Sequence, residues 1–104
     1  MKIAIASVGK KEDSDVSSRG GRAPYYLIFD DKGKFLETVS NPFAIGGGGA
    51  GPSVAKMLVD MNVDTIIAGV IGDKMADALN ERGIKYFGRE GNIKTVLSNF
   101  LKEK

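Results

Sequence analysis

Apolar and polar positions divide the first part of the chain into three short strands and a long connection. Residues 2–8 alternate small or β-branched apolar residues, a pattern typical of a strand. Residues 25–29 and 34–40 predict a second and a third strand, antiparallel to each other, because Asp30-Asp31-Lys32-Gly33 between them is a tight-turn sequence. Residues 9–24 show no apolar period and predict a long loop, which in a compact domain is usually functional or disordered.

The second part of the chain alternates helices and strands. Val54, Leu58 and Met61 recur at helical spacing after Pro52, and the apolar run 64–71 is typical of a strand covered on both faces. We expect a helix over 74–82 capped by Asp73 and ended by Gly83, a strand over 84–87, and a last helix capped by Asn92. A helix followed by a buried strand favours a parallel crossover connection. The order β-β-β-α-β-α-β-α predicts an α/β fold with a mixed five-stranded sheet and three helices, in one domain over residues 1–104.

The amino-acid composition excludes more kinds of site chemistry than the net charge does. The 104 residues contain no cysteine and no histidine, which excludes disulfides, thiolate ligands, imidazole ligands and histidine-based proton transfer. The net charge of +2 is too small to require a nucleic acid or a membrane as partner. The apolar run at the start is far shorter than the ~20 residues of a membrane helix, so no signal peptide or span is expected and a cytoplasmic location is the default.

A glycine-rich segment, residues 46–52, precedes the first predicted helix. Pro52 suits the first helical position, because the N–H that it lacks would have no partner there, and Gly51 would then be the cap. Free N–H groups at a helix start, with the helix dipole behind them, can bind an anion. The segment matches neither a P-loop nor a dinucleotide-binding fingerprint. Taken alone, the segment fits a flexible surface loop before an ordinary helix better than an anion site.

Three glycine-bearing connections are expected to meet beyond the carboxyl ends of the parallel strands, where open α/β sheets usually bind ligands. They are the loop after the first strand, residues 46–52, and residues 69–73. Arg19 and Arg22 would add permanently charged donors there, although both arginines could equally face solvent. The predicted ligand-binding residues are Arg19, Gly20, Gly21, Arg22, Ala23, Pro24, Gly47, Gly48, Gly49, Ala50, Gly51, Gly69 and Gly72.

No catalytic constellation is apparent among the remaining polar residues. The serines, Ser7, Ser17, Ser18 and Ser53, have no histidine to activate them. The acidic residues Asp13, Asp15 and Asp73 match no ion-binding loop, and we assign no metal ligand and no catalytic residue. Tyr25 and Tyr26 are adjacent on a strand and so point to opposite faces, which argues against a base-stacking platform for nucleic acid.

Two segments together resemble the dinitrogenase iron–molybdenum cofactor biosynthesis family (NifX-type domains, similar to the C-terminal domain of NifB). They are Gly21-Arg22-Ala23-Pro24-Tyr25-Tyr26 and Gly48-Gly49-Ala50-Gly51-Pro52, and Asn41-Pro42 and residues 68–72 add to the likeness, which covers essentially the whole chain. The resemblance implies a three-layer α/β/α, ribonuclease-H-like fold. It also implies a role in carrying or binding a metal-cluster precursor, with Arg22 to Pro24 and Gly48 to Pro52 lining the pocket and Gly69 and Gly72 at its floor.

The chain departs from this family where members often carry a histidine and an aromatic residue, because Arg19 and Gly20 stand there. We therefore expect a non-enzymatic binding or carrier protein for an anionic ligand, such as an iron–molybdenum or iron–sulfur cluster held without Cys or His ligation. The alternatives are a protein-interaction or regulatory module and, less favoured, a metal-dependent hydrolase by analogy of fold. In each case we expect a monomer or a weak homodimer, with a partner protein as a further binding partner. The first predicted strand carries no carboxylate for such hydrolysis.

Overall fold

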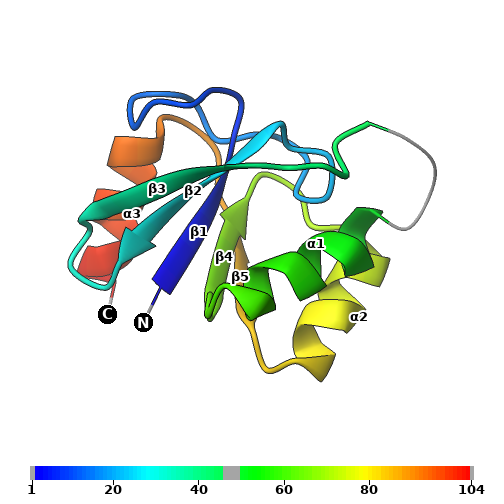
Figure 1. Cartoon of the computed structure of the whole chain (residues 1–104). Coiled ribbons are helices and arrows are strands. Elements are labelled where there is room, and N and C mark those ends of the chain that lie inside the picture. The colour runs from blue at the N-terminus through cyan, green and yellow to red at the C-terminus, as the bar shows by residue number, and fades with distance from the viewer. Residues whose placement is uncertain (1, 46–49, 104) are drawn as a thin grey trace.

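A computed structural model describes residues 2–45 and 50–103 of the chain. One five-stranded sheet, in the order β3-β2-β1-β4-β5, forms its centre. Figure 1 shows the eight elements, which follow one another as β1 (Lys2–Ser7), β2 (Tyr25–Asp30), β3 (Phe35–Ser40), α1 (Ala50–Asp60), β4 (Thr65–Ala68), α2 (Asp73–Glu81), β5 (Lys85–Gly88) and α3 (Ile93–Lys102). The predicted order and the mixed sheet with three helices are confirmed.

Strand β1 lies at the middle of the sheet and pairs in both senses. It is antiparallel to β2, with Ala4 opposite Ile28, and parallel to β4, with Ala4 also opposite Ile66. Strand β3 continues the antiparallel side and β5 the parallel side. The parallel strands β1, β4 and β5 therefore end at the same edge of the sheet, beyond which the connections to the helices lie.

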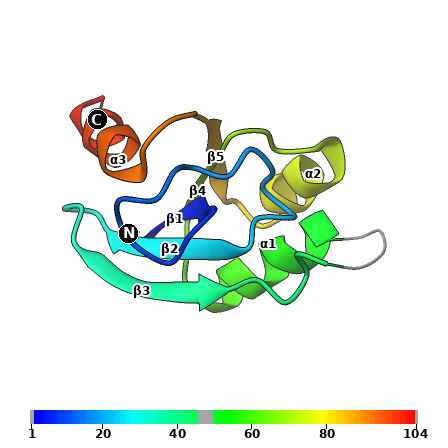
Figure 2. The ribbon, with the colours of Figure 1, turned by 90° about the horizontal axis from the view of Figure 1, so that it is seen from above.

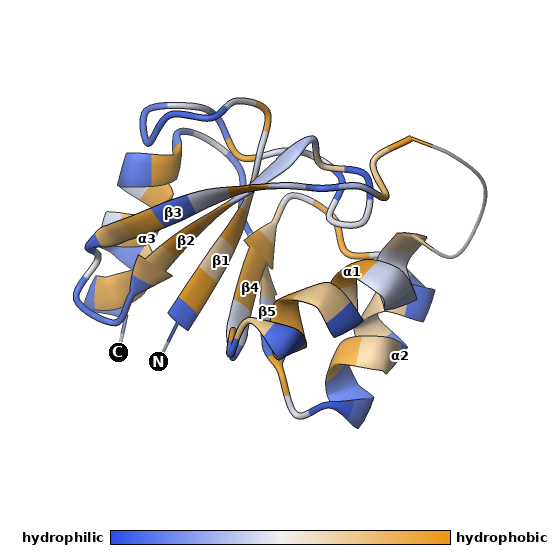
Figure 3. Cartoon of the chain, in the orientation of Figure 1, coloured by the Kyte–Doolittle hydropathy of each residue, from blue (hydrophilic) through white to orange (hydrophobic). Residues whose placement is uncertain are grey.

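The period-two pattern of the strands sends alternate residues into two separate cores. Ala4, Ile28 and Ile66 pack with α1 and α2 on one face. Ile5, Leu27 and Ile67 pack with α3 on the other. Figures 1 and 2 show the resulting three layers, with α1 and α2 on one side of the sheet and α3 on the other. Figure 3 shows that β1, β2 and β4 are apolar along most of their length, as burial on both faces requires, whereas the edge strand β3 is mixed.

Most element boundaries differ from the sequence prediction by a single residue, and three differences bear on the site. Helix α1 already begins at Ala50, so Gly51 and Pro52 are its second and third residues instead of the cap and the first residue. Proline is still accommodated, because every N–H of the first turn lacks an intrahelical acceptor. Asp73 is the first residue of α2 and not its cap; the cap is Gly72, which has no side chain to offer. The buried strand is shorter than residues 64–71, because Gly69 and Val70 bond to the loop after β1 instead.

Capping and turn residues behave as the sequence predicts at three other positions. The Asn92 side chain caps α3 by accepting the N–H of Lys94 and Thr95. Gly33 in the β2–β3 turn and Gly83 after α2 both adopt positive φ, at 87° and 71°.

Residues 9–24 form an ordered connection that is attached to the sheet near its middle. Val16 donates its N–H to Gly91 O at 2.8 Å, and Ser17 donates to Ala6 O at 2.8 Å. Both side chains are buried, at 9% and 6% exposure. None of the helices in the described part of the chain has the length and apolar character of a membrane span.

Candidate functional site

The loop after β1 and the β4–α2 connection are joined directly by backbone hydrogen bonds at the carboxyl edge of the sheet. Gly69 donates to Ser17 O at 2.9 Å, Val70 donates to Ser18 O at 2.8 Å, and Gly20 donates back to Val70 O at 2.9 Å. Figure 1 shows the start of α1 beside these two segments. The described parts of the three predicted connections therefore meet at one edge of the molecule.

Glycine allows these backbones to approach each other more closely than any other residue would. A Cβ on Gly69 would lie 2.7 Å from the Ser18 Cα, well inside contact distance. A Cβ on Gly20 would lie 3.1 Å from the Met75 Sδ at the start of α2. The absence of side chains at these two positions serves the packing of chain segments against one another.

The starts of α1 and α2 are brought side by side in the same way. A Cβ on Gly51 would lie 2.7 Å from the Met75 Cβ and 3.0 Å from its Cα. A Cβ on Gly21 would lie 3.1 Å from the Gly51 N. Gly72 differs, because nothing lies within 4 Å of its Cβ position and it faces solvent.

A shallow pocket of about 410 Å³ opens between these two helix starts and the Gly21–Arg22 backbone. Its lining residues come from all three connections: Gly21, Arg22, Ala50, Gly51, Gly72, Asp73, Lys74 and Met75. The first-turn N–H groups of α2 have no intrahelical acceptor, and its cap, Gly72, provides no side-chain oxygen. The lining of this hollow thus combines the first residues of two helices with two basic residues, Arg22 and Lys74, and one acidic residue, Asp73. This arrangement favours an anion.

Asn41 fixes the geometry of the arginine side of the pocket. Its side chain is 7% exposed, and its Nδ2 donates to Gly21 O at 3.1 Å and to Ala23 O at 2.9 Å. Its Oδ1 accepts the Phe43 N–H at 2.9 Å, and Arg22 Nη1 donates to Phe43 O at 3.1 Å. This role of Asn41 was not predicted from the sequence, where the available signal was an asparagine followed by a proline directly after β3.

Tyr26 supports the same loop from below. Its hydroxyl is buried in the sheet layer and donates to Gly20 O. Burial raises the pKa of the Tyr26 hydroxyl well above its ordinary value, so it stays protonated and remains a donor at any physiological pH.

The pocket brings together only part of the predicted set. Gly21, Arg22, Ala50, Gly51 and Gly72 line it. The other predicted residues that the structure describes do not: Gly20 and Ala23 are buried behind it, Arg19 and Pro24 are exposed, and Gly69 packs against the loop after β1. Gly47, Gly48 and Gly49 fall outside the described residues. Lys74 and Asp73 are pocket residues that the predicted set lacked.

Protein ligands for a metal ion are not gathered anywhere in residues 2–45 and 50–103. No three acidic side chains there are placed to hold a cation, and the sequence has no cysteine or histidine.

A family model described as dinitrogenase iron-molybdenum cofactor matches residues 1–103. A search of the curated proteins finds no match to the chain.

Solved structures share the fold over nearly the whole chain. The apo form of the orange protein from Desulfovibrio gigas has a TM-score of 0.90 at 28% identity, covering 98% of this chain and 88% of that one. A NifB-like protein from Thermotoga, assigned to the DUF35 family, has a TM-score of 0.82 at 34% identity, covering 97% and 87%. PH0822, at 24% identity and a TM-score of 0.85 over 100% and 93%, is similar in fold. The predicted resemblance to a NifX-type family is confirmed; the ribonuclease-H-like name for the fold stays a prediction.

Proposed function

Because the chain belongs to the dinitrogenase iron–molybdenum cofactor family, we propose that it is a non-enzymatic carrier that binds an anionic metal–sulfur or molybdenum-containing cluster precursor in the pocket between the starts of α1 and α2. The observation that carries the proposal is the meeting of two helix N-termini with Arg22 and Lys74 around one hollow. Fixed N–H dipoles and a guanidinium bind oxo or sulfido anions without a thiolate.

The lack of cysteine and histidine suits a carrier. A guest held through hydrogen bonds and charge dissociates without any exchange of ligands at its metal. The two helix starts are held in fixed relation by the contact of Gly51 with Met75, so the donors are oriented before the guest arrives.

Calorimetric titration with molybdate and with tetrathiomolybdate, under anaerobic conditions, tests the proposal. We expect binding of at least one probe, weakened about tenfold by Lys74→Gln and by Arg22→Gln, since a charge-assisted hydrogen bond contributes ~1.5–3 kcal/mol. Lys56→Gln is the matched control. Lys56 is also an exposed lysine, but it lies on α1 outside the pocket lining and pairs with Asp60 at 3.1 Å.

Two outcomes would refute the proposal. One is that neither probe binds the parent chain. The other is that Lys56→Gln weakens binding as much as Lys74→Gln does, which would indicate a diffuse effect of net charge instead of a site.

A further inference from the structure

A second hollow lies on the α3 face of the sheet, distinct from the pocket between α1 and α2. Two adjoining depressions, each of about 350 Å³, share Glu12 and Lys94. The first lies between the β2–β3 turn and α3, and the second lies between β3 and the Lys10–Asp13 segment. We call the pair the α3 groove. Its residues are Lys10, Lys11, Glu12, Asp13, Phe29, Lys32, Gly33, Phe35, Thr38, Lys94, Leu97, Ser98 and Leu101.

The walls of the α3 groove are held in place by specific contacts. Thr38 Oγ1 donates to Lys10 O at 2.8 Å, which ties the Lys10–Asp13 segment to β3. Asn92 Nδ2 donates to Asp13 O at 2.9 Å, which ties the other end of that segment to the start of α3. At the far end Gly33 lies against α3, where a Cβ on it would be 3.0 Å from the Leu101 Cδ1. The groove is thus a built feature, with three elements attached to one another around it.

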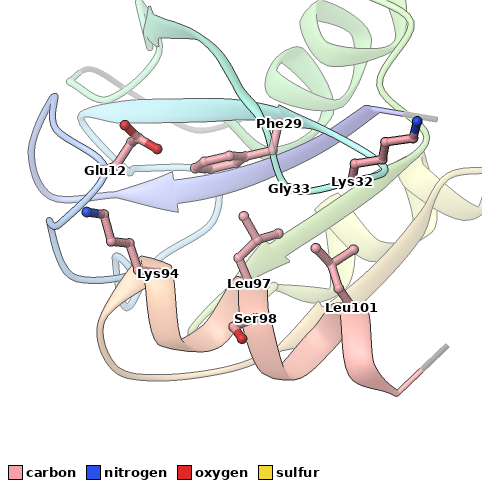
Figure 4. Close-up of a pocket in the computed structure, with 8 residues that line it drawn as sticks. All are labelled: Glu12, Phe29, Lys32, Gly33, Lys94, Leu97, Ser98 and Leu101. Atoms are coloured by element: carbon pink, nitrogen blue, oxygen red, sulfur yellow. The ribbon is translucent and has the colours of Figure 1, made fainter.

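The floor of the groove is apolar and its rim is cationic. Leu97 and Leu101 point from α3 toward the strand that carries Phe29, while Glu12 and Lys94 lie together at one end (Figure 4). The rim carries four ammonium groups and two carboxylates: Lys10, Lys11, Lys32 and Lys94 against Glu12 and Asp13. Within the described residues none of these six side chains forms an ion pair. The rim residues therefore carry more positive than negative charge, with the Lys10 ammonium lying over the Tyr25 ring at 5.7 Å from its centroid. Of the floor residues, Phe29 and Leu97 are buried and Leu101 is partly exposed.

We propose that the α3 groove docks an acidic segment of a partner protein, with one apolar side chain of that segment seated against the partly exposed Leu101, above the buried Phe29 and Leu97. A hollow of about 350 Å³ accommodates a single leucine- or phenylalanine-sized anchor. The lysines on its rim attract carboxylates that flank this anchor and disfavour basic segments. The proposal rests on the groove alone and is independent of the cluster-binding proposal.

The test begins with a display selection of random peptides against the full chain. The enriched peptides are then synthesised with a fluorescent label, and their binding is measured by fluorescence anisotropy. We expect enriched peptides to be net negative with one Leu, Phe or Met, and to lose affinity as the salt concentration rises. Ser98 is exposed and lines the groove, so changing it alters the local charge without removing packing. Ser98→Glu and Lys94→Glu should each weaken binding about tenfold, whereas Ser98→Lys should preserve or strengthen it.

Lys56→Glu is the matched control, since Lys56 lies on α1 across the sheet, and it should bind as the parent does. Thermal unfolding of each variant separates loss of binding from loss of fold. The proposal is overturned if no peptide is enriched, if the enriched peptides are neutral or basic, or if Ser98→Glu and Ser98→Lys bind equally well.

Discussion

Replacing Asn41 tests whether one buried amide holds the arginine side of the pocket. Asn41→Ala removes the donor to Gly21 O and Ala23 O and the acceptor of the Phe43 N–H. Asn41→Asp has the same shape and keeps that acceptor, but it places a negative oxygen beside two carbonyl oxygens. The two variants therefore separate loss of the side chain from loss of its donor.

The size of the effect follows from the burial of each bond. A buried polar group left without a partner costs ~1–3 kcal/mol. The carbonyl of Gly21 adds little to this cost, because Gly21 is only half-buried and water would reach it. We expect Asn41→Ala to lower the free energy of unfolding by about 2–3 kcal/mol, or roughly 10–20 °C in Tm for a domain of this length. At neutral pH Asn41→Asp should be at least as destabilising.

The pH dependence distinguishes Asn41→Asp from Asn41→Ala. Burial beside two carbonyls should raise the pKa of the introduced carboxyl in the folded state, so its penalty grows as the pH rises through that pKa. Below the unfolded-state pKa, about 3.9, the protonated form regains one donor and the penalty relative to the parent is smallest. Far-UV circular dichroism melts of parent, Asn41→Ala and Asn41→Asp, from neutral pH down to about pH 4, measure this. The reasoning is refuted if Asn41→Asp is as stable as the parent at neutral pH, or if its deficit does not change with pH.

Two further predictions concern packing and the β2–β3 turn. Gly51→Ala should lower the free energy of unfolding, measured by chemical denaturation, by about 1 kcal/mol, because overlap with Met75 (~1–3 kcal/mol) outweighs the ~1 kcal/mol gain in helix propensity. Gly72→Ala, with nothing within 4 Å of the new Cβ, should change it by no more than about 0.5 kcal/mol. Equal effects at the two positions would contradict this reasoning. Asp30 accepts the N–H of Lys34 and Lys32, both at 2.9 Å, and the bond from Lys34 is the main cause of its lowered pKa. Its carboxylate therefore stabilises the fold above the unfolded-state pKa, and this contribution is lost as the pH falls through the folded-state pKa. The Asp30→Asn variant should therefore have a lower Tm than the parent at neutral pH, and this difference in Tm should shrink as the pH is lowered. A difference that grows would contradict the role given to Asp30.

The fold could be predicted because its signals are local. Alternation in β1, the tight turn at Asp30–Gly33 and the cap at Asn92 each lie within a few residues of the structure that they determine. The meeting of the connections also followed, because parallel strands end at a common edge.

The details of the site depend on contacts between distant parts of the chain, which no local pattern contains. Asn41 reaches back to the backbone of Gly21 and Ala23, and Gly51 is small because α2 packs on it through Met75. In the same way Ala23 is a core residue although its neighbour Arg22 lines the pocket, since the Cβ atoms of successive residues there point in different directions.

The anchoring of Val16 and Ser17 divides what looks like one connection into two short, separately supported spans. The span before this anchor forms a wall of the α3 groove, and the span after it approaches the pocket between α1 and α2. The anchor is bonded to Gly91 on one side and to Ala6 on the other, so each span has a fixed end of its own. One connection in the chain thus contributes to both hollows, its first half to the α3 groove and its second half to the pocket between α1 and α2.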